Sequence, residues 1–358
     1  ISCIMQAIMI TRKLLLWYSK NKRALPFRRT NDPYKIWLSE VMLQQTKVKT
    51  VIPYYKRWLK RYPTLQSAAE ARTDSLLKLW EGLGYYQRCR NFHRALKIVV
   101  TNYKGKIPSS FDYFIDLPGV GEYTAGAVLS IAFNKPIPAI DGNVKRVMSR
   151  ILGIKNLTLY NNRRIKKTIY KFIPTGNPGD FNQALMELGA LLCTPQSPNC
   201  TKCPITKYCN AYKLSKPELY PLPKEPKKNP HYIIVTGVIW RDSKFYIQKR
   251  DEKSMLGGLW EFPGGKVKNK ESLEGALKRE IEEECGIIPI IKNKIGCVEH
   301  SYSHFSISLY CFHCIEGEEK IQFSKKRSWI THKEIGLYPF PKANHKLFTL
   351  IKTKGWNV

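Results

Sequence analysis

The spacing of apolar residues divides the chain into two parts. From residue 11 to about 212, apolar residues recur three or four positions apart, which predicts amphipathic helices; one such series is Ile36, Leu38, Val41 and Met42. Prolines and glycines interrupt the pattern between these segments. After residue 230 the period changes. Residues 231–240, 245–249 and 305–314 are predicted to be strands, and residues 274–284 a helix.

A proline-rich stretch separates the two parts. Residues 216–230 contain five prolines, a composition typical of a stiff, extended linker. We therefore predict a helical domain over residues 9–212, a linker over 213–230 and a smaller α/β domain over 231–355. No internal repeat is visible.

The charge balance changes this picture by suggesting a partner. The 60 Lys and Arg residues exceed the 28 Asp and Glu residues and leave a net charge of +32. Such an excess favours polyanions, mainly nucleic acid and less often an anionic membrane surface. The alternative is a Lys-rich composition that only keeps the protein soluble. Apolar residues make up 43% of the chain, which excludes wholesale disorder.

The beginning of the chain does not resemble a signal peptide. Residues 1–10 are apolar, but Thr11, Arg12 and Lys13 follow at once, and no apolar run approaches the roughly 18 residues that a membrane span needs. Met5 or Met9 is a plausible true start. We expect a soluble intracellular protein.

Four of the ten cysteines lie within seventeen residues, in the order Cys193, Cys200, Cys203 and Cys209. Clustered thiolates in an intracellular chain indicate a metal site rather than disulfides. Zinc sites usually pair two Cys-x2-Cys knuckles, whereas this pattern has one such knuckle and two wider gaps. The spacing therefore favours an iron–sulfur cluster over zinc, and over free thiols that are close by chance.

Two motifs are typical of contacts with DNA and of acid chemistry. In the turn Leu117-Pro-Gly-Val-Gly, Gly119 and Gly121 allow the backbone to approach a partner, and the following helix would present free N–H groups to a phosphate. Asp141 precedes another helix in an N-cap position that keeps a carboxylate ionised. Each motif also has a purely structural interpretation, as a tight turn and a plain helix cap.

Glu40 is the second carboxylate of interest. It lies among apolar residues within 37–46, and such surroundings raise the pKa of a carboxyl group so that it can act as a general acid near neutral pH. Glu40 and Asp141 could divide the work of proton donor and fixed anion, as chemistry at a sugar carbon requires.

Six motifs follow one another along this part of the chain: Pro-Phe-Arg ending at Arg28, residues 39–46 and 82–86, the Leu-Pro-Gly-Val-Gly turn, residues 140–143 and the four-cysteine spacing. Through these motifs, residues 28–212 closely resemble the MutY family of adenine DNA glycosylases, within the helix–hairpin–helix superfamily that includes endonuclease III. The resemblance implies an all-α glycosylase domain that contains an iron–sulfur loop.

The resemblance also implies roles for the matching residues. Glu40 would protonate the adenine, Asp141 would stabilise or transiently attack the sugar cation, and Tyr123 and Asn143 would line the pocket, with Arg28 at its edge. Gln45 and Tyr85 would wedge into the base stack when the adenine is flipped out. Cys193, Cys200, Cys203 and Cys209 would hold a [4Fe–4S] cluster that supports DNA binding.

Tyr123 distinguishes this chain from its relatives that also cut the strand. Endonuclease III-like enzymes carry a lysine nucleophile there, and a tyrosine cannot form a Schiff base, so monofunctional hydrolysis is expected. The chain departs from the family pattern at Phe27, where a tryptophan is usual, and at Gln183, where some relatives carry a glutamate. The glutamine at position 183 puts in doubt a supporting acid at that position, but not the main pair, Glu40 and Asp141.

The C-terminal part matches every fixed position of the Nudix box, from Gly265 through Arg279 to Ile287. On a helix, Glu280, Glu283 and Glu284 would share a face, where a Mg²⁺ ion could offset their repulsion. The alternative is a solvated acidic helix face. The resemblance implies an α/β Nudix-fold domain, which in the MutY family recognises 8-oxoguanine in DNA and usually has an eroded box.

Other parts of this domain resemble MutT, which destroys oxidised guanine nucleotides. Asn344 matches the residue that reads the oxidised base in MutT, but Arg327 and Ser328 precede Trp329 where MutT-type enzymes tend to place a further acidic ligand. Residues 300–305 resemble the MutY loop that probes the oxidised guanine, with Ser303 and His304 at its tip, although a plain loop would look similar.

We therefore predict a two-domain repair enzyme that excises adenine mispaired with 8-oxoguanine or guanine in double-stranded DNA. It is expected to be monomeric and to act in the bacterial cytoplasm and nucleoid. Two alternatives remain open. The protein could hydrolyse oxidised nucleoside triphosphates such as 8-oxo-dGTP, either in addition to adenine excision or in place of it, or it could be a non-catalytic iron–sulfur DNA-binding module. Intact Glu40 and Asp141 argue against the last.

Overall fold

The computed structural model describes residues 3–223, 229–322 and 324–355. The chain forms two units, one made of Ile1–Glu70 and Asn91–Glu225 and the other of Ala71–Arg90 and Pro226–Val358. The predicted linker carries a short 3-10 helix, η4 (Pro217–Leu219), and its residues 224–228 lie outside the described part.

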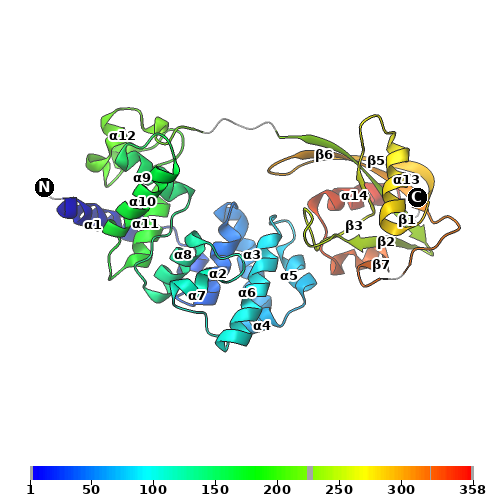
Figure 1. Ribbon diagram of the computed structural model, residues 1–358, viewed down its shortest axis with the longest axis horizontal. Helices are drawn as coiled ribbons and strands as arrows, with labels where there is room; N and C mark the ends of the chain where they lie inside the picture. The colour runs from blue at the N-terminus through cyan, green and yellow to red at the C-terminus, as the bar shows by residue number, and fades with distance from the viewer. Residues whose placement is uncertain (1–2, 224–228, 323, 356–358) are drawn as a thin grey trace. The chain divides into compact units, whose positions relative to one another are not determined.

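The first unit is helical, as predicted (Figure 1). One of its cores forms where α1 (Cys3–Asn21), α9 (Gly142–Leu152) and α11 (Pro178–Leu191) bury their apolar faces together. No helix among the described residues is both long and apolar enough to cross a membrane. The other helices of this unit are α2 (Pro33–Leu43), α3 (Val48–Arg61), α4 (Leu65–Ala69), α7 (Phe111–Ile115), α8 (Glu122–Phe133), α10 (Leu159–Phe172), α12 (Asn210–Lys213) and most of α6 (Gln87–Tyr103).

Helix α2 carries Glu40, one of the two carboxylates of interest. It begins where the Asp32 side chain accepts a hydrogen bond from the Tyr34 amide, with Pro33 in the first turn. From Ile36 to Met42 every residue is buried. Because this helix is surrounded by protein on nearly all sides, a carboxyl group on it is removed from water.

The second unit is built on a seven-stranded sheet with the path β3-β2-β1-β6-β5, to which β4 and β7 add at β1 and β2. Strands β1 and β6 pair in parallel, and all other pairs are antiparallel. The strands are β1 (His231–Arg241), β2 (Lys244–Lys249), β3 (Trp260–Glu261), β4 (Gly264–Lys266), β5 (Ile290–Ser301), β6 (Ser306–Ile315) and β7 (Arg327–Ile330). The three predicted strands are confirmed as β1, β2 and β6.

Two helices cover the opposite faces of this sheet (Figure 1). Along β1, Val235 and Ile239 pack toward α13 (Leu273–Cys285), whereas Val238 packs toward α14 (Lys342–Thr353). This alternation follows from the two-residue repeat of a strand. Helix α13 confirms the helix predicted over residues 274–284.

Residues 71–90 group with the C-terminal part of the chain. This segment contains α5 (Thr73–Trp80), where Asp74 pairs with Lys249 at 2.5 Å. Glu81 accepts hydrogen bonds from the Phe340 amide at 2.7 Å and from His345 at 2.8 Å. These polar contacts join the segment to the strand-rich part of its unit.

Candidate active site

The Glu40 carboxyl group lies on α2, and only 7% of the residue is exposed. Burial raises the pKa of Glu40 to about 7, and the neighbouring Asp141 charge adds to the rise, while a hydrogen bond from Tyr123 and the charge of Arg28 oppose it. The Tyr123 hydroxyl donates that bond to Glu40 Oε2 at 2.5 Å. The predicted rise in pKa is confirmed.

The Asp141 carboxylate caps α9, as its position in the sequence predicts. Its Oδ1 accepts a hydrogen bond from the Val144 amide at 2.7 Å, and its Oδ2 accepts one from the Asn143 side-chain amide at 2.8 Å. Both bonds fix the orientation of the carboxyl group. Asn143 is thus bonded directly to the second carboxylate of the site.

A cavity of about 210 Å³ brings these side chains together. Its wall includes Glu40, Tyr123, Asp141, Asn143 and Arg28, which are residues predicted from the sequence. Gln183, noted as a departure from the family pattern, lines the same cavity. The enclosure therefore holds a carboxyl group that titrates near neutrality and a hydrogen-bonded carboxylate.

Sequence reasoning missed Glu187, whose side chain is fully buried beside this cavity. It receives hydrogen bonds from Arg23 at 2.6 and 2.9 Å and from Arg28 at 2.9 Å. Although burial opposes the change, these bonds lower the pKa of Glu187 to about 2. An acidic residue within the apolar run of α11 is the signal that could have revealed it.

A second connection runs from the site toward the cysteine loop. Arg146 donates a hydrogen bond to Asn143 Oδ1 at 2.7 Å and another to the Cys193 carbonyl at 2.8 Å. The chain of bonds Asp141–Asn143–Arg146–Cys193 therefore links the carboxylate to the first cysteine of the cluster. No pattern in the sequence indicates this link.

An open cleft of about 790 Å³ adjoins the cavity and shares Tyr123, Asp141 and Asn143 with it. Gln45, in a left-handed conformation with φ of 55°, and both glycines of the predicted phosphate-binding turn line this cleft. Gly119 has φ of 79°. Helix α8 begins directly after Gly121, so its first amides lie at the cleft, as the motif predicts.

The four cysteines form a neighbourhood of free, half-buried thiols. Burial raises the pKa of Cys200, Cys203 and Cys209, and the nearby Cys193 sulfur raises each of them further. Arg150 Nη1 donates a hydrogen bond to the Cys193 sulfur at 3.2 Å. Four soft sulfur donors on one loop fit an iron–sulfur cluster. In the described part of the chain, however, no three His, Cys, Asp or Glu side chains are close enough to hold a metal ion as they stand.

The second unit contains a cavity of about 430 Å³ against the Nudix-box helix. Glu280, Glu284 and Glu261 line it, and Asn344 and His304 lie in its wall. Glu261 was not predicted; burial raises its pKa to about 7. Its position two residues before the sequence Pro-Gly-Gly is the signal that could have drawn attention to it.

The box residues are already engaged with protein groups. Glu284 accepts hydrogen bonds from Gln248 at 2.6 Å and from the Gly264 amide at 3.0 Å, and Glu280 pairs with Arg279 at 2.7 Å. Glu283 is 57% exposed and is not among the residues that line the cavity. Of the three glutamates predicted to share one helix face, Glu280 and Glu284 therefore line the cavity and Glu283 does not.

Two predicted DNA-binding residues meet within the second unit. The Tyr85 hydroxyl lies 3.4 Å from His304 Nε2, and Tyr85 has a left-handed backbone with φ of 48°. Ser303 lies beside His304 and accepts a long bond from Asn229 through its carbonyl at 3.4 Å.

Comparisons with known proteins show which families the two parts of the chain resemble. Residues 38–174 match the HhH-GPD superfamily of base excision DNA repair proteins, and residues 235–350 match the NUDIX domain. The chain is 34% identical to an adenine DNA glycosylase of Buchnera aphidicola subsp. Schizaphis graminum, over 97% of this chain and all of the relative. It is 38% identical to that of Buchnera aphidicola subsp. Acyrthosiphon pisum, over 85% of this chain and 86% of the relative.

A solved structure described as a thermostable thymine-DNA glycosylase is similar to the helical part. The alignment covers 59% of this chain and 98% of the chain in that structure, with 28% sequence identity and a TM-score of 0.55. The first of the two Buchnera relatives aligns over nearly the whole chain, including both matched domains. The chain therefore belongs to the adenine DNA glycosylase family.

Proposed function

We propose that this protein removes adenine from double-stranded DNA by hydrolysing its N-glycosidic bond, where the adenine is mispaired with 8-oxoguanine or guanine. The observation that carries the proposal is the shared cavity of Glu40 and Asp141, about 210 Å³ in volume. An adenine flipped out of the stack would enter it from the adjoining cleft.

Glu40 supplies the proton that makes the base a better leaving group. With a pKa near 7, a large fraction of this carboxyl group is protonated at neutral pH, so it can donate without a high energetic cost. The Tyr123 hydroxyl holds the carboxyl group in place. Proton transfer to the adenine ring weakens the bond to the sugar carbon.

Asp141 acts on the sugar. As the bond breaks, positive charge develops at the sugar carbon, and a carboxylate fixed by Val144 and Asn143 stabilises it without having to reorganise. Water then completes the hydrolysis and leaves an abasic site. Tyr123 offers no amine for a Schiff base, so the strand is left uncut.

The remaining elements serve binding. Cys193, Cys200, Cys203 and Cys209 would hold a [4Fe–4S] cluster, which supports DNA binding and takes no part in the hydrolysis. Gln45, Tyr85, Ser303 and His304 would contact the base stack and the damaged guanine. The protein works as a monomer inside the bacterial cell.

The test is product analysis with matched duplexes. Adenine release is measured from duplexes in which adenine lies opposite 8-oxoguanine, guanine or thymine. We expect release from the first two and none from the third, with a strand that breaks only after alkali. DNA binding without release from any duplex would instead support a non-catalytic DNA-binding module.

We also propose a second function, Mg²⁺-dependent hydrolysis of oxidised nucleoside triphosphates such as 8-oxo-dGTP. The cavity of the second unit favours it, because carboxylates of Glu261, Glu280 and Glu284 and the side chain of Asn344 line one space of about 430 Å³. Oxygen donors of this kind suit Mg²⁺, and Glu280 and Glu284 would hold it.

Hydrolysis of 8-oxo-dGTP by the full-length protein tests this function. We expect Mg²⁺-dependent turnover that Glu284→Gln abolishes, while adenine release from DNA is unchanged. The matched control is Glu282→Gln on the same helix, because Glu282 is not a lining residue of the cavity. Absence of turnover by the folded wild-type protein would restrict this domain to the recognition of damage in DNA.

A further inference from the structure

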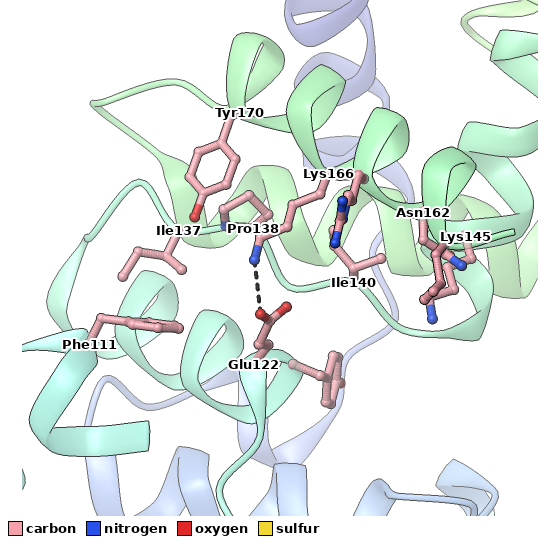
Figure 2. A pocket seen from close by; sticks show the side chains of 12 residues that line it. Phe111, Glu122, Ile137, Pro138, Ile140, Lys145, Asn162, Lys166 and Tyr170 are labelled. Atoms are coloured by element: carbon pink, nitrogen blue, oxygen red, sulfur yellow. Dashed lines mark hydrogen bonds and ion pairs between the residues drawn. The ribbon is translucent and has the colours of Figure 1, made fainter. Parts of the chain in front are cut away.

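A second groove borders the active site on the helical unit. Its volume is about 430 Å³, and it lies between α8, α10 and the segment 137–140 (Figure 2). Tyr123, Ile140 and Lys145 belong both to this groove and to the open cleft beside the catalytic cavity. The groove is therefore a continuation of the cleft. Excision by Glu40 and Asp141 makes no use of it.

The two ends of the groove differ in character. Figure 2 shows Phe111, Ile137 and Tyr170 near one end, and Pro138 also lines the groove. Lys145 and Asn162 lie at the other end, and Arg163 also lines the groove. Tyr170 is 49% exposed, so its ring is available to a ligand. An apolar, aromatic end and a polar, cationic end match the base and the phosphate of one nucleotide.

The charges favour an anion. Glu122 is the one acidic residue in the lining, and Lys166 pairs with it across the groove at 3.0 Å (Figure 2). Neither Lys145 nor Arg163 forms an ion pair with any residue that the structure describes. After the one internal pair is counted, two cationic groups remain for a ligand, on a chain whose net charge is +32.

We propose that this groove binds an unpaired nucleotide of single-stranded DNA that continues from the duplex held in the cleft. Stacking on aromatic rings and contact of phosphates with basic side chains are the common features of single-strand binding. A nucleotide that stays paired within the base stack could not enter, because its base faces its partner inside the helix. Continuity with the cleft favours DNA of the same substrate over a free nucleotide. The inference rests on the proposed function for the placement of the duplex.

The test compares a blunt duplex carrying adenine opposite 8-oxoguanine with the same duplex extended by about six unpaired nucleotides at either end of the adenine strand. Binding is measured in the Asp141→Asn background, so that the adenine stays in place. We expect an extension to tighten binding about fivefold or more. Tyr170→Ala and Arg163→Ala should each abolish this gain and leave the affinity for the blunt duplex unchanged.

The matched control is Arg164→Ala, because Arg164 lies on the same helix, is exposed and does not line the groove. It should retain the full gain. The inference is overturned if the extension gives no gain, if the groove variants retain it, or if Arg164→Ala loses it equally. Failure to bind even the blunt duplex would contradict the proposed function instead, so the two failures can be told apart.

Discussion

At the scale of single residues, we expect the protonation of Glu40 to set the pH dependence of excision. The carboxyl group must be protonated to donate, and its pKa is about 7. We therefore expect the single-turnover rate to be level below pH 6 to 7 and to fall about tenfold per pH unit well above that value. Glu40→Gln should be slow at all pH values. A wild-type rate that rises between pH 7 and 9 would contradict the acid role.

The buried Glu187 carboxylate is expected to stabilise the folded protein. Glu187→Gln leaves Arg23 and Arg28 without their shared partner, and breaking a buried pair from one side costs about 3–5 kcal/mol. Because the folded pKa is lowered to about 2, this stabilisation is present above about pH 4.5 and is lost as the pH falls toward 2.

Denaturant unfolding of both proteins at pH 7 and pH 3 checks this. The control is Glu122→Gln, whose exposed ion pair should contribute less than about 0.5 kcal/mol. Equal stability of Glu187→Gln and the wild-type protein at pH 7 would show that the ion-pair cluster does not stabilise the fold.

Glu40 and Asp141 could be selected as candidates from their local sequence, whereas Tyr123 was indicated only by the family resemblance. Their placement around one cavity could not be predicted, since it depends on how α2, α8 and α9 pack. Glu187 and Arg146 were missed for a related reason. Each contacts partners far away in the sequence, and although an acidic residue in the apolar run of α11 marks Glu187 as unusual, it does not identify those partners.

At the scale of elements, the two glycines of the turn before α8 differ in role: the fold requires a glycine at Gly119, whereas Gly121 is expected only to let the backbone approach a phosphate. Gly119 has φ of 79°, and an added Cβ atom would lie 2.7 Å from Asn91 Cβ. We expect Gly119→Ala to lower the free energy of unfolding by at least about 1–2 kcal/mol. Gly121 has φ of −108° and open space around it, so Gly121→Ala should fold normally.

Both substitutions should weaken DNA binding, because a side chain at either position keeps the backbone away from a phosphate. Thermal denaturation and DNA titration of the two variants separate these effects. Unchanged DNA affinity of Gly121→Ala would contradict the phosphate-binding role of the turn.

The periodicity of apolar residues predicted the helices and strands better than it predicted which segments belong to the same unit. The change from a helical to a strand repeat located β1, β2, β6 and α13 within one residue or so of their observed ends. The short strands β3, β4 and β7 and the edge strand β5 were not predicted, because two to four residues show too little alternation and β5 is mostly exposed. The grouping of residues 71–90 with the C-terminal part depends on contacts such as Asp74 with Lys249, which no local pattern reveals.

At the scale of the whole molecule, the net charge of +32 predicts binding that depends strongly on salt. If the basic surface contacts about six or more phosphates, the dissociation constant should rise about 10³-fold or more between roughly 50 and 200 mM salt. Titration of a fluorescent duplex over this range measures the slope. A dissociation constant that hardly changes would indicate that the charge excess only keeps the protein soluble.

Excision by Glu40 and Asp141 in one cavity is the central proposal, and single-turnover assays of their amide variants test it most directly. Adenine release and DNA binding are measured for the wild-type protein, Glu40→Gln and Asp141→Asn on a duplex with adenine opposite 8-oxoguanine. We expect both variants to bind the duplex as tightly as the wild type and to release adenine at least about 100-fold more slowly. Release at the wild-type rate by either variant would contradict the catalytic role of that carboxyl group.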